Sequence, residues 1–267
     1  MIRKPVVAGQ FYPDDVNELK KQLESFIDAE AKKSNALGIV SPHAGYMYSG
    51  RVAGSAFSQV NIPDTVIILA PNHTGHGTPY SIWPDGTWQT PLGNVTVDNE
   101  LVNLLTSECN LLSKDYEAHR FEHSAEVIIP FLQHLNPKVK IAVIVVMSRN
   151  INELKELGKS LSTVIKSYTP NALVVASSDM THQESEESAN RKDKIAIEQI
   201  IKLDEKGLYD KVEEMDISMC GIYPTVSMLV CSKERGASTA RLTRYETSGE
   251  TTGDYDHVVG YAGVIVK

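Results

Sequence analysis

Three short runs of apolar, largely β-branched residues each end in a turn that carries a histidine. The runs and their histidines are residues 37–40 with His43, residues 66–70 with His73, and residues 172–176 with His182. Runs of this kind, bounded by Gly, Pro and Ser, are typical of buried strands in a parallel sheet. Open α/β sheets bind ligands beyond the carboxyl ends of such strands. The pattern therefore predicts an α/β fold in which the three histidines share one cleft.

The rest of the chain alternates predicted helices with predicted strands. Helices are expected at residues 14–33, 50–60, 98–105, 124–135, 151–167, 184–215 with a break at residues 203–207, and 221–234, and further strands at residues 140–147, 238–245 and 258–266. No linker rich in Pro, Gly or Ser and no charge block divides the 267 residues, so residues 1–267 are predicted to form a single domain. The expected fold class is α/β, with a central mixed, mostly parallel sheet flanked by helices.

Proline residues give two local predictions. Pro130 lacks an amide donor and would crowd the carbonyl of Glu126, so it should kink the helix at residues 124–135. The turn Pro84-Asp85-Gly86 lies in a segment rich in Gly, Pro and Thr, which predicts a small β-hairpin around it.

Composition narrows the classes of partner and compartment. The net charge of −8 argues against broad binding to nucleic-acid phosphates. The N-terminal residues lack the apolar segment of a signal peptide, and no stretch is long enough to span a bilayer. Cys109, Cys220 and Cys231 form an odd set without a paired metal spacing, which favours a reducing compartment. We expect a cytoplasmic protein with unpaired cysteines and with neither nucleic acid nor membrane as a partner.

His43 and His73 follow successive predicted strands, so they are candidates for a shared metal site. Two imidazole nitrogens could hold a cation at about 2.0 to 2.2 Å. The alternative is a pair of hydrogen-bonded loop histidines, and the residues alone leave both interpretations open. His76, in the same turn as His73, is expected at the surface or behind the ligands.

Asp179 and His182 lie in the turn after a third predicted strand. The carboxylate could orient the imidazole as a general acid or base that titrates near neutrality. The alternative is that Asp179 and the serines before it only cap a following helix. In Glu122-His123-Ser124, Ser124 is an ordinary N-cap candidate, and the local sequence gives His123 a structural role.

Cys220 and Glu250 are weaker candidates. Cys220 precedes a predicted helix, where the helix dipole could lower the pKa of a thiol, but a buried structural cysteine is the more common case. Glu250 lies in a Gly-containing loop that could supply a carboxylate to the cleft. Two histidines and one carboxylate with open positions are the ligand set of non-haem Fe(II) oxygenases.

Six motifs in order along the chain resemble those of the Memo family. They are SPHAGYMYSGRVAG, APNHTGHG, FEHSAEVIIPFL, SSDMTH, MCGIYP and YETSGETTGDYDHVVGYAG. The match runs from Ala8 to the last predicted strand and covers nearly the whole chain. The fold of that family resembles class III extradiol dioxygenases of the protocatechuate 4,5-dioxygenase type, whose non-haem Fe(II) is held by two histidines and a glutamate.

The resemblance implies specific roles for residues of this chain. His43 and His73 would be metal ligands, and His182 would be the catalytic histidine with Asp179 beside it. His123 also lies in a family motif, which makes it a third candidate for a catalytic role. The metal implied is divalent, Fe(II) in the first place, with copper and zinc as alternatives.

The third metal ligand departs from the family pattern. Eukaryotic Memo proteins have a cysteine at that position, which aligns here with Thr251. Glu250 is the neighbouring carboxylate, and we expect it to complete the site, because a divalent cation on two neutral imidazoles needs a nearby anion.

Two functions are compatible with the resemblance. The first is a metal-dependent oxidoreductase that acts on an unknown small molecule. The second is a non-enzymatic adaptor that binds phosphotyrosine peptides or protein partners in the same cleft, as animal members of the family are described to do. Prokaryotic members are often encoded beside a radical SAM protein and an AMMECR-type domain, which suggests association with such proteins in a shared modification pathway.

Overall fold

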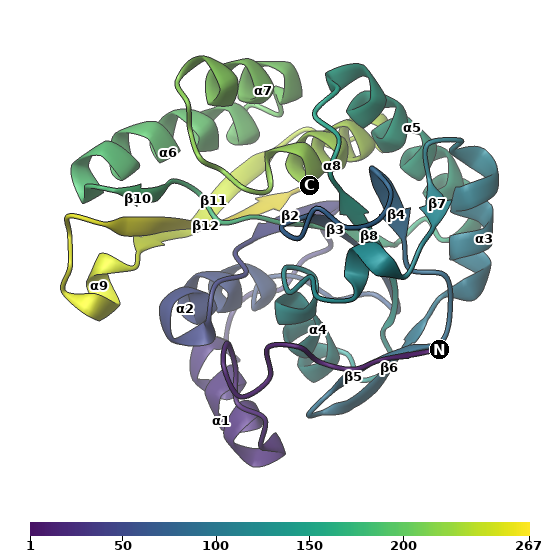
Figure 1. Cartoon of the computed structure of the whole chain (residues 1–267), viewed down its shortest axis with the longest axis horizontal. Helices are drawn as coiled ribbons and strands as arrows, with labels where there is room; N and C mark the ends of the chain where they lie inside the picture. Colours follow the sequence, from purple (N-terminus) through teal and green to yellow (C-terminus); the bar gives the residue numbers. More distant parts are fainter.

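A twelve-stranded mixed sheet runs through the centre of the protein, and helices cover both of its faces (Figure 1). The computed structural model describes residues 1–267. The strands are β1 (Ile2–Arg3), β2 (Gly38–Ser41), β3 (Thr65–Pro71), β4 (Tyr80–Ile82), β5 (Thr87–Thr90), β6 (Gly93–Val97), β7 (Ser113–Lys114), β8 (Lys140–Val146), β9 (Leu173–Ser177), β10 (His182–Glu184), β11 (Ala240–Thr247) and β12 (Val258–Val266). The expected α/β class, with a mixed and mostly parallel central sheet, is confirmed.

The helices form a layer on each face of the sheet. They are α1 (Val16–Phe26), α2 (Tyr46–Phe57), α3 (Asn99–Glu108), α4 (Ile129–Leu135), α5 (Ile151–Tyr168), α6 (Glu186–Ile201), α7 (Glu205–Glu214), α8 (Ile222–Glu234) and α9 (Gly249–Thr252), with 3₁₀ turns η1 (Glu117–His119) and η2 (Glu126–Ile128). Helix α8 packs on β9, β3 and β2 beside α5 and α7, whereas α2 packs on β2, β11 and β12 beside α1 and α4 (Figure 1). None of these helices has the length and apolar character needed to cross a membrane.

The middle of the sheet positions the site. Strands β8, β3, β9 and β2 are parallel neighbours in that order, and every residue of β3, β9 and β2 is buried. Burial on both faces explains why these strands are continuous apolar runs without polar alternation. The chain passes from β2 through α2 to β3, but β2 and β3 are not neighbours in the sheet, because β9 lies between them. Since the three strands are parallel, the carboxyl ends of β3, β9 and β2 lie side by side.

The proline predictions differ from the structure. Instead of one kinked helix, the chain forms η2 and then α4, with Pro130 in the first turn of α4, where its missing amide removes no helical hydrogen bond. The turn Pro84-Asp85-Gly86 joins β4 to β5, but these strands do not pair, because β4 pairs antiparallel with β8 instead. The hairpin of this region is β5 with β6, which turns between Thr90 and Gly93.

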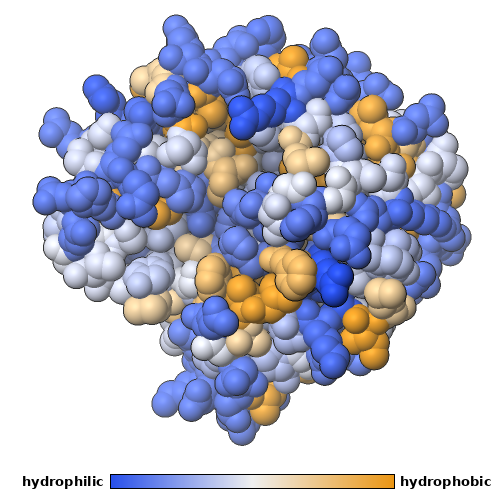
Figure 2. Space-filling model, viewed as in Figure 1, coloured by the Kyte–Doolittle hydropathy of each residue, from blue (hydrophilic) through white to orange (hydrophobic).

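Helix boundaries follow capping more closely than apolar spacing. Asp15 accepts hydrogen bonds from the amides of Asn17 and Glu18 and starts α1, but α1 ends at Phe26 and does not continue to residue 33, where the predicted helix ended. Asp98 caps α3 by accepting a hydrogen bond from the amide of Leu101. On the face shown in Figure 2, hydrophilic residues predominate and apolar residues form small, separate patches.

Candidate metal centre

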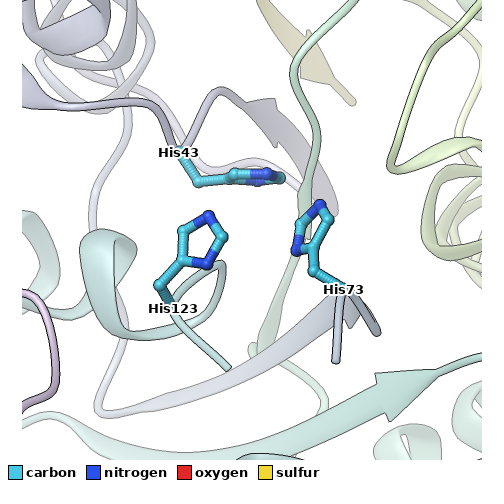
Figure 3. Close-up of side chains that lie close together, drawn as sticks. All are labelled: His43, His73 and His123. Carbon is cyan, nitrogen blue, oxygen red and sulfur yellow. The ribbon is translucent and has the colours of Figure 1, made fainter. Parts of the chain in front are cut away.

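Three histidine rings converge on one point (Figure 3). One ring nitrogen from each of His43, His73 and His123 lies within 4.8 Å of the other two. The ring centroids are 5.2 Å apart for His43 and His73, 5.5 Å for His43 and His123, and 4.9 Å for His73 and His123. The side chain of His43 is buried, and those of His73 and His123 are 33% and 25% exposed. Three imidazoles in this arrangement can share one cation and leave it open toward solvent.

The fold explains how two of the three rings come together. His43 follows β2 and His73 follows β3, and only β9 separates these strand ends in the sheet. The expected convergence of His43 and His73 is therefore confirmed. The third member is His123, from the segment between η1 and η2, and not His182.

Hydrogen bonds fix which nitrogen of His43 is free. Its Nδ1 lies 2.8 Å from the hydroxyl oxygen of Ser177, and that hydroxyl donates its proton to the carbonyl of Ser124 at 2.7 Å. Ser177 must therefore accept from Nδ1–H, which leaves the lone pair on Nε2. Burial, together with the nearby charges of His73 and His123, lowers the pKa of His43 well below its usual value. A neutral ring with a free Nε2 is the form that binds a metal.

Glu122 fixes His73 in the same way. The buried carboxylate accepts from Nδ1 of His73 at 2.8 Å and from the backbone amides of His73 at 2.5 Å and Ser124 at 3.0 Å. Burial alone would raise the pKa of Glu122, but the hydrogen bond and charge of His73, with the two amides, lower it to about 2. Burial alone would lower the pKa of His73, but Glu122 outweighs it and the pKa is raised.

A carboxylate behind a metal-binding histidine is a common arrangement at metal centres, because it fixes the ring and makes the free nitrogen more basic. Sequence reasoning did not assign a role to Glu122. The signal present was its place directly before His123 in the FEHS motif.

His123 is held by packing more than by hydrogen bonds. Its ring stacks on His73 at an interplanar angle of 22° and meets the edge of Phe11 with the centroids 5.0 Å apart. Burial lowers its pKa, although the nearby Glu122 carboxylate opposes that shift. The local sequence favoured a purely structural role for His123, and the structure instead places it in the cluster.

Asp179 and His182 are close in sequence but have separate partners. One oxygen of Asp179 accepts from the backbone amides of His43 at 2.8 Å and Ala44 at 3.3 Å, so the carboxylate holds the loop that carries His43. Burial raises the pKa of Asp179. His182 instead donates from Nδ1 to the carbonyl of Ser218 at 2.9 Å, which leaves its Nε2 free. The expectation that Asp179 orients the ring of His182 was wrong, because Ser218 does so.

Glu250 does not belong to the histidine cluster. Residues 249–252 form the short helix α9, and Glu250 is exposed on it. The hydroxyl of Thr251 donates to the carbonyl of Met47 at 3.3 Å. The structure therefore does not bring the expected third ligand to the other two, because the loop folds as a helical turn with this side chain toward solvent. His76 is exposed, as expected.

A cleft of about 480 Å³ opens beside the cluster. His73 and Cys220 line it on the side of the cluster, and Ser218, which orients His182, also lines it. Arg149 and Tyr223 are further polar groups on its wall, among apolar residues from β8 and α8. This volume is within the range of small-molecule sites.

The side chains fit a transition metal or zinc better than calcium or magnesium. Neutral imidazole nitrogens suit iron, copper and zinc, whereas magnesium and calcium prefer oxygen ligands. The free Nε2 atoms of His43 and His73 and the carboxylate behind His73 meet the requirements for a site that could hold such an ion.

Comparison with known proteins gives consistent matches along the chain. A family model described as "Memo-like protein" matches residues 3–265. A MEMO1 family protein from Sulfurisphaera tokodaii is 43% identical over 281 residues and covers 99% of both chains, and one from Methanopyrus kandleri is 39% identical over 281 residues and covers 100% of this chain and 99% of its own. Among solved structures, an uncharacterized protein from Escherichia coli K12 aligns over 76% of this chain and 86% of its own, with 14% identity and a TM-score of 0.46.

Proposed function

Because the chain belongs to the Memo-like protein family, we propose that it is a metal-dependent oxidoreductase resembling the class III extradiol dioxygenases. The observation that supports this most is the convergence of His43, His73 and His123 beside a cleft of small-molecule size. Iron(II) is the proposed metal, with copper and zinc as alternatives that metal analysis distinguishes. When bound, the metal would act as a Lewis acid and orient the substrate for reaction with oxygen.

The residues of the chain have separate tasks in this proposal. Ser177 and Glu122 keep a lone pair on His43 and His73 directed at the metal. Asp179 holds the His43 loop through two backbone amides. His182, fixed by Ser218, has a free Nε2 that can take a proton from a substrate and return it.

His123 replaces Glu250 as the proposed third ligand. The cation then has three neutral nitrogens, and its charge is balanced from behind His73 by Glu122, which the charge and hydrogen bonds of His73 and the amide of Ser124 keep ionised despite its burial. Glu122 therefore supplies the negative charge for which Glu250 was expected, and it does so without direct contact between a carboxylate and the metal.

The first test is the metal content of protein purified without oxygen. Wild type should carry about one equivalent of metal per chain at a site of this kind, and His43→Ala should lose most of it. His76→Ala is the matched control, since His76 is an exposed histidine in the turn of His73, and it should keep the wild-type content. Wild-type protein that retains no metal and takes up none would contradict the proposal.

The adaptor function is an outcome of the same experiment. Metal-free wild-type protein that binds a phosphotyrosine peptide, with binding lost on substitution of Arg149 in the cleft, would favour the adaptor function.

For the oxidoreductase, nitric oxide added to iron-loaded protein should change the electron paramagnetic resonance spectrum, because this diatomic probe binds only an iron with an open position. His182→Gln should keep the metal and this spectrum and lose turnover.

A further inference from the structure

A second cavity, of about 490 Å³, lies at the N-terminal edge of the sheet and shares no residue with the cleft beside the histidine cluster. β1 forms this edge by pairing in parallel with β5 (Figure 1). The cavity, here called the N-terminal pocket, is lined by residues 1–6, Trp83, Tyr116, Glu117, Arg120 and Phe121. Its volume is within the range of small-molecule sites.

Hydrogen bonds fix the walls of the N-terminal pocket. Trp83 is 3% exposed and donates from Nε1 to the carbonyl of Asp85 at 2.7 Å. The hydroxyl of Tyr116 donates to the carboxylate of Asp85 at 3.0 Å. On the other wall, the buried side chain of Arg3 donates from Nε to the carbonyl of His119 at 3.2 Å, which joins β1 to the segment around η1. The pocket is therefore preformed, which suits a small molecule because binding does not have to order the wall.

Exposed apolar side chains gather at this pocket. Met1, Ile2 and Phe121 line it and are 64%, 58% and 59% exposed. They are three of the nine large hydrophobic side chains that are exposed in the whole chain. Single exposed apolar residues are ordinary, but a group of them around a cavity is typical of a binding site. An apolar ring placed between Phe121 and Trp83 would be removed from water, which favours binding.

The charges on the wall favour an anion as the polar part of the ligand. Most of them already have a partner, since the N-terminal amine pairs with Asp85, Arg3 with Glu126, and Arg120 with Glu117. Lys4 is exposed at the pocket and has no such partner. One positive charge is thus left uncompensated here, in a chain whose net charge is −8. An anionic group on the ligand would complement it.

We propose that the N-terminal pocket binds a small amphipathic anion. The ligand has an apolar or aromatic body, which Trp83 and Phe121 hold, and one carboxylate or similar anionic group, which pairs with Lys4. The guanidinium of Arg120 lies over the ring of Phe121, 5.2 Å from its centroid, and offers a second cation to the same group. This site is separate from the metal centre and does not depend on it.

Anilinonaphthalene sulfonate is the probe, because it joins an aromatic body to one sulfonate and becomes fluorescent when it leaves water. The two tryptophans of the chain report on this pocket, since Trp83 lines it and the ring centroid of Trp88 lies 5.7 Å from that of Trp83. Excitation of tryptophan should therefore give dye emission by energy transfer, and the titration should saturate at about one dye per chain. Neutral pH is required, because the dye also binds partly unfolded acid states.

Substitutions on the wall test both parts of the ligand. Phe121→Ala should bind the dye at least about tenfold more weakly, because it removes an exposed aromatic wall and leaves the core intact. Lys4→Glu should weaken binding about fivefold at low salt, and it should not affect the same dye without its sulfonate. The matched controls are an exposed aromatic residue and an exposed lysine outside the pocket, Tyr255→Ala and Lys32→Glu, and both should match wild type.

The outcomes that would overturn the proposal are distinct. The first is a wild-type protein that binds no dye, or an affinity that is unchanged in either Phe121→Ala or Lys4→Glu. Weaker binding in Arg149→Ala would place the dye in the cleft beside the histidine cluster instead. A wild-type dimer that Phe121→Ala converts to a monomer in sedimentation would mean that a second copy of the chain covers the pocket. His43→Ala should bind the dye like wild type, so a failure of the metal centre leaves this test intact.

Discussion

Glu122 and His73 are joined at two points, since one carboxylate oxygen accepts from the ring Nδ1 at 2.8 Å and the other from the backbone amide at 2.5 Å. These contacts fix both the ring and the turn that carries it. Glu122 is adjacent to His123, so one residue links two of the three histidines. The rigidity of the cluster depends on this carboxylate.

Glu122→Gln should weaken metal binding by about 10- to 100-fold, the usual effect of removing a partner behind a metal ligand. The amide cannot supply the negative charge that makes His73 more basic. Calorimetric titration with metal measures this change in affinity. Glu117→Gln is the control, because Glu117 is an exposed carboxylate in the same segment whose ion pair is with Arg120. An equal loss in both variants would mean that Glu122 has no special role.

Metal affinity should rise with pH as His73 loses its proton. A metal must displace the proton from Nε2, and Glu122 raises the pKa of His73, so protons compete up to a higher pH than for an ordinary histidine. In Glu122→Gln that pKa falls, and the pH at which metal binding is half-maximal should move to lower values. Titrations across a pH series give this midpoint, and a midpoint that does not move would contradict the pairing.

Acid should destabilise the protein in a window that Glu122 helps to define. Its pKa in the folded protein is lowered from 4.5 to about 2. A carboxylate whose pKa is lowered in the folded protein stabilises the fold at pH values above its pKa in the unfolded chain. That contribution is lost as the pH falls from about 4.5 through about 2. Urea denaturation at several pH values should show a shallower acid decline for Glu122→Gln than for wild type.

Arg3 should be important for stability, although it lies near the end of the chain. Its side chain forms a buried ion pair with Glu126 and donates to the carbonyl of Glu122 at 2.5 Å. Arg3→Met would leave the buried carboxylate of Glu126 without its cation, which costs about 3 to 5 kcal/mol. Asp85→Asn breaks the exposed pair with the N-terminal amine and should cost less than about 1 kcal/mol. Urea unfolding distinguishes the two, and similar losses would contradict this account.

The sequence predicted the parts of the site that strand pattern controls. His43 and His73 end apolar runs, and parallel strands bring such ends together, so their convergence followed from periodicity and topology. The position of His123 did not, because it lies in a segment without regular period whose path depends on tertiary contacts of Arg3 and Glu126.

The other departures have similar causes. Glu250 was expected at the metal by its place in the chain, but the helical turn of α9 exposes it. β4 was expected to pair within a local hairpin, but the long-range pairing with β8 prevails. The local sequence indicates where the chain can form a turn. It does not indicate which distant strand or loop a segment will pair with or pack against.

The most direct measurement is calorimetric titration of wild type, His123→Ala and Glu250→Ala with iron(II) in the absence of oxygen. Loss of a ligand should weaken binding at least as much as loss of a supporting residue, so His123→Ala should bind at least about 10- to 100-fold more weakly. Glu250→Ala should bind like wild type, because Glu250 is exposed on α9 and outside the cluster. Unchanged affinity in His123→Ala together with weakened binding in Glu250→Ala would contradict the three-histidine centre.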